Sequence, residues 1–290
     1  MHNESPVSEH HFVFVIGMHR SGTTLLGDLI ASHPEASGLT GTGVNMNEGS
    51  LIQTAFPLPP GLGSLAFKRH SRHTEASPYA NAEVARKLWA EWSPYWDTSK
   101  PLLVEKSPNH IMSTRLLQAL FPNSTFVCIL RHPVAQALAI KKWATNRSLL
   151  QFMTNWAMCH NRLLADLPHL RRKVVFRYED FCRTPEDHLR MIFQTLGLPD
   201  GPPLDRQIRS SNARYYDAWA EAGHGLQGIA ARALLGRNFR KFGYLLSSPY
   251  KTAPEFIFDQ PPPAAPLPAP QKRDQTRPAP EKVLEDAAPR

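Results

Sequence analysis

The sequence predicts an α/β fold: a three-layer sandwich in which helices cover both faces of a central parallel sheet. Short apolar runs, typical of buried strands, alternate along the chain with longer segments of helical periodicity. The first apolar run, Phe12–Ile16, leads into a turn framed by Gly17 and Gly22, and a helix follows directly. Such a turn at a helix N-terminus binds anions. We therefore expect a ligand at the carboxyl ends of the strands.

The remaining elements follow in chain order. The expected strands are Phe12–Ile16, Leu102–Val104, Thr125–Leu130 and Lys173–Phe176. The expected helices are Thr23–Ser32, Ala82–Trp92, His110–Leu120, Val134–Trp143, Leu149–Asp166 and Pro185–Leu196. The first helix ends at His33, because a residue before proline avoids helical geometry, and Gly197 ends the last one. Residues 35–80, rich in Gly, Pro, Ser and Thr, are expected to form an irregular functional excursion.

Composition favours one domain, residues 1–250, with a polar arm at residues 1–11. Residues 260–290 are expected to form a disordered tail, since residues 261–290 hold 9 of the 27 prolines. The run Phe12–Ile16 is too short for a signal or a membrane span, so a cytoplasmic protein is expected. The net charge of +8 suits an anionic ligand without identifying it. Three scattered cysteines without metal spacing predict no metal site.

The turn after the first strand differs from the usual triphosphate loop. That loop has the pattern G-x-x-x-x-G-K-[ST], whereas Thr23 stands at the lysine position here. Arg20 is the only cation within the turn, and Ser21, Thr23 and Thr24 add hydroxyl groups. A phosphorylated ligand other than a magnesium-bound triphosphate is therefore favoured. The alternative is a tight turn without any ligand.

Three further candidates lie where later strands end. Lys106 follows the second expected strand, and a solvated lysine is the alternative to a ligand-binding cation. Arg131 ends the third, where burying a guanidinium is costly unless an anion or an internal carboxylate accompanies it. Tyr178 follows the fourth and could contact a nucleotide or belong to the core. Glu48, in the excursion, is functional only if that loop folds back over the turn, and Glu35 competes with it.

These segments carry a family resemblance. Residues 16–26 (IGMHRSGTTLL) resemble the 5′-phosphosulfate loop of sulfotransferases, and residues 126–133 (FVCILRHP) resemble the strand end that binds the 3′-phosphate. Residues 176–181 (FRYEDF) resemble the third recurrent segment of that family. The versions here look closer to the bacterial and tyrosyl-protein-type branch than to the cytosolic enzymes. The resemblance implies a P-loop NTPase-like sulfotransferase fold.

The resemblance also implies an activity and roles for the candidates. The expected reaction moves the sulfuryl group of 3′-phosphoadenosine 5′-phosphosulfate (PAPS) to an alcohol or amine acceptor, without a metal. The cofactor-binding residues would be Arg20, Ser21, Gly22, Thr23, Thr24, Leu25, Arg131 and Tyr178. The catalytic residues would be Glu48 as the base, with Arg20 and Lys106 as the cations that stabilise the transferring group.

Two positions depart from the family pattern. Ala139 stands eight residues after Arg131, where family members usually have a serine, and Thr145, Ser148 or the basic segment 237–241 are candidates to replace it. The cytosolic branch has a catalytic histidine near Ser107–Asn109, which makes His110 an alternative base. The acceptor and the oligomeric state are not predicted.

Two other functions compete with a sulfotransferase. A nucleotide kinase on the same fold would need a loop lysine and a magnesium-binding acid. A non-enzymatic binder of polyanions would use the basic segment 68–73 and the net charge. Since the loop lacks its lysine and three motifs occur in order, we expect a sulfotransferase rather than a nucleic-acid binder.

Overall fold

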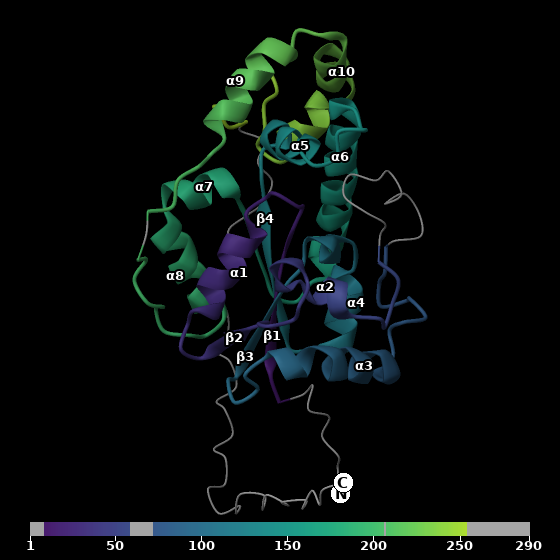
Figure 1. Cartoon of the computed structure of the whole chain (residues 1–290), viewed down its shortest axis with the longest axis vertical. Helices are drawn as coiled ribbons and strands as arrows, with labels where there is room; N and C mark the ends of the chain where they lie inside the picture. Colours follow the sequence, from purple (N-terminus) through teal and green to yellow (C-terminus); the bar gives the residue numbers. More distant parts are fainter. Residues whose placement is uncertain (1–8, 59–71, 206, 254–290) are drawn as a thin grey trace, which may run out of the picture.

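A sheet of five parallel strands forms the centre of the computed structural model, which describes residues 9–58, 72–205 and 207–253 (Figure 1). The strands lie in the order β2-β3-β1-β4-β5. They are β1 (His11–Gly17), β2 (Ala36–Gly38), β3 (Leu102–Lys106), β4 (Ser124–Leu130) and β5 (Lys173–Arg177). Because all pairs are parallel, the carboxyl ends of the five strands share one edge.

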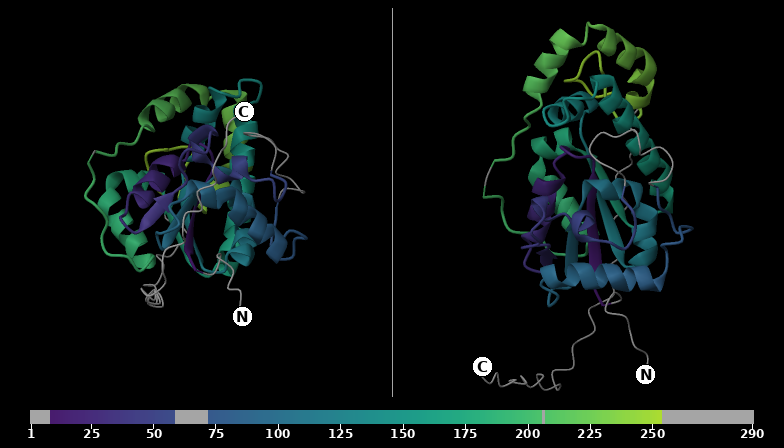
Figure 2. Two further views of the ribbon diagram at one scale, coloured as in Figure 1. Left: turned by 60° about the horizontal axis from the view of Figure 1, so that its bottom comes forward. Right: turned by 45° about the vertical axis from the view of Figure 1, so that its right-hand side comes forward.

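Helices cover both faces of the sheet, as predicted for a three-layer sandwich (Figures 1 and 2). One face carries α1 (Thr23–Ala31), α7 (Tyr178–Arg183) and α8 (Pro185–Thr195). The other carries α3 (Ala82–Trp92), α4 (Thr114–Leu120) and α6 (Leu149–Asp166). Beyond the carboxyl edge lie α5 (Pro133–Lys141), α9 (Ala213–Ala222) and α10 (Leu226–Arg240). The short helix α2 (Gly49–Ile52) lies in the segment between β2 and α3.

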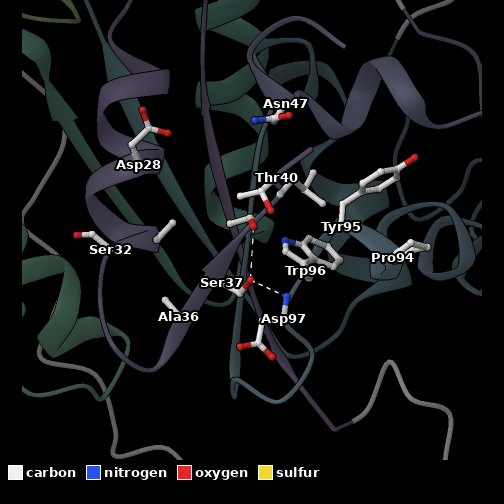
Figure 3. Close-up of a pocket in the computed structure, with 13 residues that line it drawn as sticks. Asp28, Ser32, Ala36, Ser37, Thr40, Asn47, Pro94, Tyr95, Trp96 and Asp97 are labelled. Atoms are coloured by element: carbon white, nitrogen blue, oxygen red, sulfur yellow. Dashed lines mark hydrogen bonds between the residues drawn. The ribbon is translucent and has the colours of Figure 1, made fainter. Parts of the chain in front are cut away.

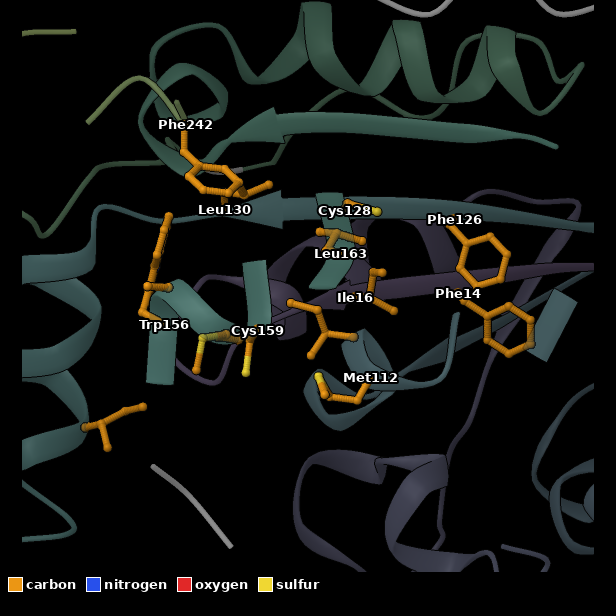
Figure 4. Close-up of a cluster of buried hydrophobic side chains, with 14 of the residues drawn as sticks. Phe14, Ile16, Met112, Phe126, Cys128, Leu130, Trp156, Cys159, Leu163 and Phe242 are labelled. Carbon is orange, nitrogen blue, oxygen red and sulfur yellow. The ribbon is translucent and has the colours of Figure 1, made fainter. Parts of the chain in front are cut away.

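Side-chain alternation along the buried strands divides the core into two layers. In β1, Phe12, Phe14 and Ile16 face α3, α4 and α6, whereas Val13 and Val15 face α1 and α8. Strands buried on both faces need apolar residues at every position, which explains the continuous apolar runs. Figure 4 shows the larger layer, where Phe14, Phe126 and Trp156 lie among aliphatic and sulfur-containing side chains.

Most of the predicted elements are confirmed to within a few residues. The helices at Ala82–Trp92 and Leu149–Asp166 have the predicted bounds. The predicted helix over His110–Leu120 is instead a 3-10 turn, Pro108–Met112, followed by α4. Strand β2 was not predicted, because Ala-Ser-Gly has no apolar or β-branched run. The helices α2, α7, α9 and α10 were also not predicted.

The predicted ends of the chain lie mostly outside the described residues. Strand β1 begins at His11, one residue inside the predicted arm, and residues 1–8 lie outside the described residues. The predicted tail, residues 260–290, also lies outside them. Among the helices that the structure describes, none is long and apolar enough to cross a membrane. No cluster of three or more His, Cys, Asp or Glu suited to a metal occurs in the described ranges.

Candidate functional site

The turn between β1 and α1, residues 17–22, has the geometry of an anion-binding loop and is called the phosphate loop. Gly22 has a φ of 96°, and a Cβ there would lie 2.9 Å from Cδ2 of Tyr178, so only glycine fits. Gly22 is also the N-cap of α1 and supplies no side-chain cap, which leaves the first N–H groups of the helix for a ligand. The hydroxyl of Ser21 is buried and lacks a partner in the described structure. Thr23, Thr24 and Leu25 form the first turn of α1.

Arg20 is the exposed residue of this loop. It adopts a left-handed backbone conformation with a φ of 69°, which is unfavourable for a residue with a Cβ. Its guanidinium carbon lies 5.4 Å from the ring centre of Trp143, a side chain that is 65% exposed. Arg20 has no ion pair within the described residues. Its charge is therefore available to a ligand.

Arg131 follows β4 and is buried without an internal carboxylate. Its Nε donates to Oδ1 of Asn212 at 2.8 Å, one terminal nitrogen donates to the carbonyl of Arg20 at 2.6 Å, and the other to the hydroxyl of Ser211 at 3.1 Å. Only 5% of the residue is exposed, and the described residues provide no carboxylate within 4.0 Å. The internal-carboxylate alternative is therefore wrong for the described structure, and a buried charge with neutral partners favours an anionic ligand.

The ring of Tyr178 packs against the guanidinium of Arg131. The guanidinium carbon of Arg131 lies 4.6 Å from the ring centre of Tyr178, and that ring also contacts Gly22. Burial raises the pKa of Tyr178, so its hydroxyl stays protonated at neutral pH. Glu179 beside it accepts hydrogen bonds from the His132 backbone, from Asn212 and from Tyr244. Tyr178 thus joins the phosphate loop to Arg131.

Lys106 lies at the end of β3 against α1. A Cβ on Gly27 would lie 3.0 Å from Cβ of Lys106, so the missing side chain of Gly27 makes room for the lysine stem. The ammonium nitrogen is 3.3 Å from Oε1 of Glu48 and donates to the carbonyl of Met46 at 3.0 Å. Lys106 is only 7% exposed. It is an organised buried cation beside the phosphate loop, which rules out the solvated-lysine alternative.

Glu48 comes to this position because its loop folds back over the end of β3. Met46 and Asn47 both have left-handed backbones, with φ values of 55° and 49°, which turn the chain sharply before Glu48. Burial raises the pKa of Glu48, while the charge of Lys106 acts in the opposite direction. A carboxylate with a raised pKa beside a cation has the properties expected of a general base.

His19 was not predicted as part of the site. It belongs to the phosphate loop, and its carbonyl accepts a hydrogen bond from Gln136 at 3.0 Å. Burial and, secondarily, the positive charge of Lys106 lower the pKa of His19 to about 4. The imidazole is therefore neutral at physiological pH. The sequence signal that could have placed His19 in the site is its position inside the glycine-framed turn, two residues after Gly17.

The two alternative bases lie elsewhere. Glu35 is exposed and precedes β2, so it lies at the amino edge of the sheet, opposite the end at which Lys106 lies. His110 has no exposed surface, and its Nδ1 lies 2.8 Å from Oε2 of Glu105. Neither side chain is placed to reach an acceptor near the phosphate loop.

The missing serine leaves an apolar position and basic neighbours. Ala139 is only 1% exposed. A cavity of about 410 Å³ between α5 and α9 is lined by Lys141, Lys142 and Arg214 around Tyr215. Of the proposed replacements for the serine, Ser148 caps α6 through the backbone N–H of Gln151. Thr145 and the 237–241 segment stay candidates for this role.

A second hollow lies beside the edge strand β2. This cleft of about 650 Å³ runs from α1 to the turn at residues 93–95, with Asn47 at one end (Figure 3). Its walls carry two acids, Asp28 and Asp97, and two aromatic side chains, Tyr95 and Trp96. Trp96 also packs in the core, as does its neighbour Trp92.

The described part of the basic segment 68–73 makes contacts within the protein instead of offering its charge to a polyanion. Arg72 is ion-paired with the buried Asp166, and His73 is buried with its Nε2 3.0 Å from the carbonyl of Pro57. Residues 68–71 lie outside the described residues. The two described members are thus structural.

A phosphate loop and two buried cations at the carboxyl edge of a parallel sheet are the features expected of a protein that binds a phosphorylated nucleotide. A model of the sulfotransferase family matches residues 13–202, well over half of the chain. The chain therefore belongs to the sulfotransferase family.

Individual relatives are distant. Nodulation protein NoeE of Sinorhizobium fredii is 24% identical over 213 residues, which are 63% of this chain and 49% of that protein. The chain thus spans about half the length of this curated relative. The sulfotransferase domain of the Synechococcus PCC 7002 olefin synthase is 20% identical, with a TM-score of 0.46, over 76% of this chain and 92% of its own. The sulfotransferase domain of the curacin biosynthetic pathway is also 20% identical, with a TM-score of 0.43, over 71% and 82%.

Proposed function

We propose that this chain, through a domain spanning residues 1–250, transfers the sulfuryl group of PAPS to a hydroxyl or amine acceptor. One observation carries the proposal: Lys106 and Glu48 meet beside a phosphate loop whose own cation, Arg20, has no protein counter-ion in the described structure. The family match supports the cofactor. A buried unpartnered Ser21 hydroxyl and a cradle that only glycine fits suit the 5′-phosphosulfate, and Arg131 suits the 3′-phosphate.

The residues divide the work between charge and proton transfer. PAPS supplies an activated sulfuryl group, and adenosine 3′,5′-bisphosphate is the leaving group. Arg20 and Lys106 hold positive charge where negative charge develops, and loss of one such donor typically lowers the rate by about 10²–10³. Glu48 accepts the acceptor's proton, a role worth about 10²–10⁴. Assigning the base to Glu48 follows the tyrosyl-protein-type branch and is part of the proposal.

The deciding experiment measures transfer of labelled sulfate from PAPS to a panel of sugars, phenols, lipids and peptides. Glu48→Gln should lower turnover by about 10²–10⁴ while binding of adenosine 3′,5′-bisphosphate is retained. The matched control is Glu35→Gln, the same change at an exposed carboxylate on the opposite edge of the sheet, which should leave turnover unchanged. An active Glu48→Gln enzyme would remove Glu48 from the mechanism, and no transfer to any acceptor class would count against the activity.

A further inference from the structure

Behind the Glu48–Lys106 pair lies a buried polar network, formed by Glu105, Ser107 and His110. Neighbouring residues of a strand point to opposite faces, so Glu105 faces the α3 and α4 side while Lys106 faces α1. Glu105 has no exposed surface. Its Oε2 lies 2.8 Å from Nδ1 of His110, and its Oε1 accepts a hydrogen bond from the hydroxyl of Ser107. Removing a carboxylate from water costs on the order of several kcal/mol of folding free energy unless hydrogen bonds such as these compensate for the lost hydration.

This network binds the backbone of the loop at the two residues that follow Glu48. The backbone N–H of Gly49 donates to Oε1 of Glu105 at 3.0 Å, and that of Ser50 donates to the hydroxyl of Ser107 at 2.9 Å. The carbonyl of Gly49 accepts from Nε1 of Trp92 at 3.0 Å. A Cβ on Gly49 would lie 2.8 Å from Oε1 of Glu105, so the loop approaches the carboxylate as closely as glycine permits.

These contacts also explain why the Glu48 side chain is free. Glu48 is the N-cap residue of α2, a position whose side chain commonly accepts a hydrogen bond from the first turn of its helix. Here the first N–H groups of α2 already have partners in Glu105 and Ser107, and Glu48 makes no cap bond. Its carboxylate can therefore turn toward Lys106.

We propose that Glu105 and Ser107 are positioning residues, which cap α2 from the strand end and so hold Glu48 in place to act as the base. The inference rests on the proposed function, since it assigns the network to the same site. A displacement of about 1 Å at a reacting group can lower a rate by 10²-fold, so loss of the network should lower kcat strongly.

The test is a double-mutant cycle on purified full-length chain. Glu105→Met keeps the approximate length of the side chain but removes both acceptor oxygens, and should lower kcat by about 10- to 100-fold with the Kd for adenosine 3′,5′-bisphosphate unchanged. In the Glu48→Gln background the same change should lower kcat by less than about twofold, because residues that act as a unit are not additive. A purely structural role would lower kcat equally in both backgrounds.

A matched control is Asp166→Leu, which removes an equally buried carboxylate that bonds to Arg72 and Thr114 instead of the Glu48 loop. It should leave kcat unchanged in protein that folds. If Glu105→Met does not fold, Ser107→Ala, which removes only the partner of the Ser50 N–H, takes its place in the cycle. Equal losses in both backgrounds, an unchanged kcat, or a tenfold weaker bisphosphate affinity would each overturn the inference.

The same data separate this inference from the proposed function. If Glu48→Gln is inactive and the Glu105 and Ser107 variants are fully active, the positioning role alone is wrong. If Glu48→Gln is itself active, the base assignment fails and the positioning role fails with it.

Discussion

At the scale of single residues, two cations of the site, Arg20 and Arg131, have no acidic partner within the described residues. Arg131 is held by an amide, a hydroxyl and a carbonyl, and Arg20 by an aromatic ring. Within the described structure, Lys106 is the one of these three cations that has a carboxylate partner, Glu48. Neutral partners orient a guanidinium without cancelling its charge, which suits binding of a doubly phosphorylated nucleotide.

The Lys106–Glu48 pair should be visible in the pH dependence of turnover. A base works when deprotonated, so kcat should rise with pH through the pKa of Glu48, which burial raises and Lys106 lowers. Lys106→Met removes the opposing charge, so the pKa of Glu48 should rise further and the acid limb of the profile should move to higher pH. The measurement is kcat against pH for both proteins. An acid limb that does not move would show that Glu48 is not the titrating group.

Arg131 should discriminate between nucleotides by their 3′-phosphate. Arg131→Met should weaken binding of adenosine 3′,5′-bisphosphate by roughly 10- to 100-fold, since a charge-assisted pair is worth about 1.5–3 kcal/mol. Binding of adenosine 5′-phosphate, which lacks the 3′-phosphate, should change much less. Titration calorimetry with both nucleotides gives the comparison, and Arg190→Ala, an exposed arginine on α8, is the control. An equal loss for the two nucleotides would contradict the assignment.

Local sequence patterns located the cations but not what holds them. The glycine frame and the strand ends identified Arg20, Lys106 and Arg131, because the positions of the strands and of their carboxyl ends follow from the hydrophobic pattern. Asn212, which anchors Arg131, lies 81 residues further along the chain, and no local pattern relates the two. Glu105 could have been noticed, since alternation in β3 places it on a buried face next to Lys106.

At the scale of elements, the loop between β1 and α1 depends on backbone conformation as much as on side chains. Strand β1 and helix α1 were predicted because their periodicity and glycine frame are local. Strand β2 was missed because three small residues become a strand only by pairing with β3. Helix α10 was missed because its apolar face is weak and the helix contains Gly228 and Gly236. The apolar face of α9, formed by Tyr215, Tyr216 and Trp219, could have predicted that helix.

A matched pair of glycines separates strain from steric fit. Gly22→Ala should abolish or strongly weaken nucleotide binding, because the new Cβ would lie 2.9 Å from Tyr178 as well as requiring a φ of 96°. Gly41→Ala imposes a similar backbone strain, with a φ of 68°, but its Cβ meets nothing within 4 Å. Both should lose about 1 kcal/mol of stability, whereas only Gly22→Ala should lose affinity for adenosine 3′,5′-bisphosphate. Equal affinities in calorimetry would mean that the loop tolerates a side chain.

At the scale of the whole molecule, buried neutral histidines link stability to pH. Burial lowers the pKa of His11 to about 4, and of His132 and His160 to about 3. The unfolded chain takes up protons at these residues below pH 6.5, while the folded chain resists protonation. Their contribution to stability is therefore complete above pH 6.5 and is lost as the pH falls.

The expected slope is about 1.4 kcal/mol per pH unit for each of these histidines between pH 6.5 and their folded pKa values. Urea midpoints measured from pH 7.5 to 5 should fall accordingly. His160→Phe keeps an aromatic ring against Trp156 and should reduce the slope of stability with pH by the contribution of one histidine. His169→Gln, at an exposed position, should not. A midpoint independent of pH would contradict the burial of these groups.

Gly27 bears on any attempt to engineer a more stable form of the protein. Gly27 lies in the middle of α1, where alanine would favour the helix by roughly 0.5–1 kcal/mol, but its missing side chain is the space that the Lys106 stem occupies. Helix propensity therefore favours alanine at a place where its Cβ would lie 3.0 Å from the Cβ of Lys106, so the lysine would have to move. Selection for thermal tolerance and selection for turnover are expected to diverge at this position, so variants of α1 need to be screened for both.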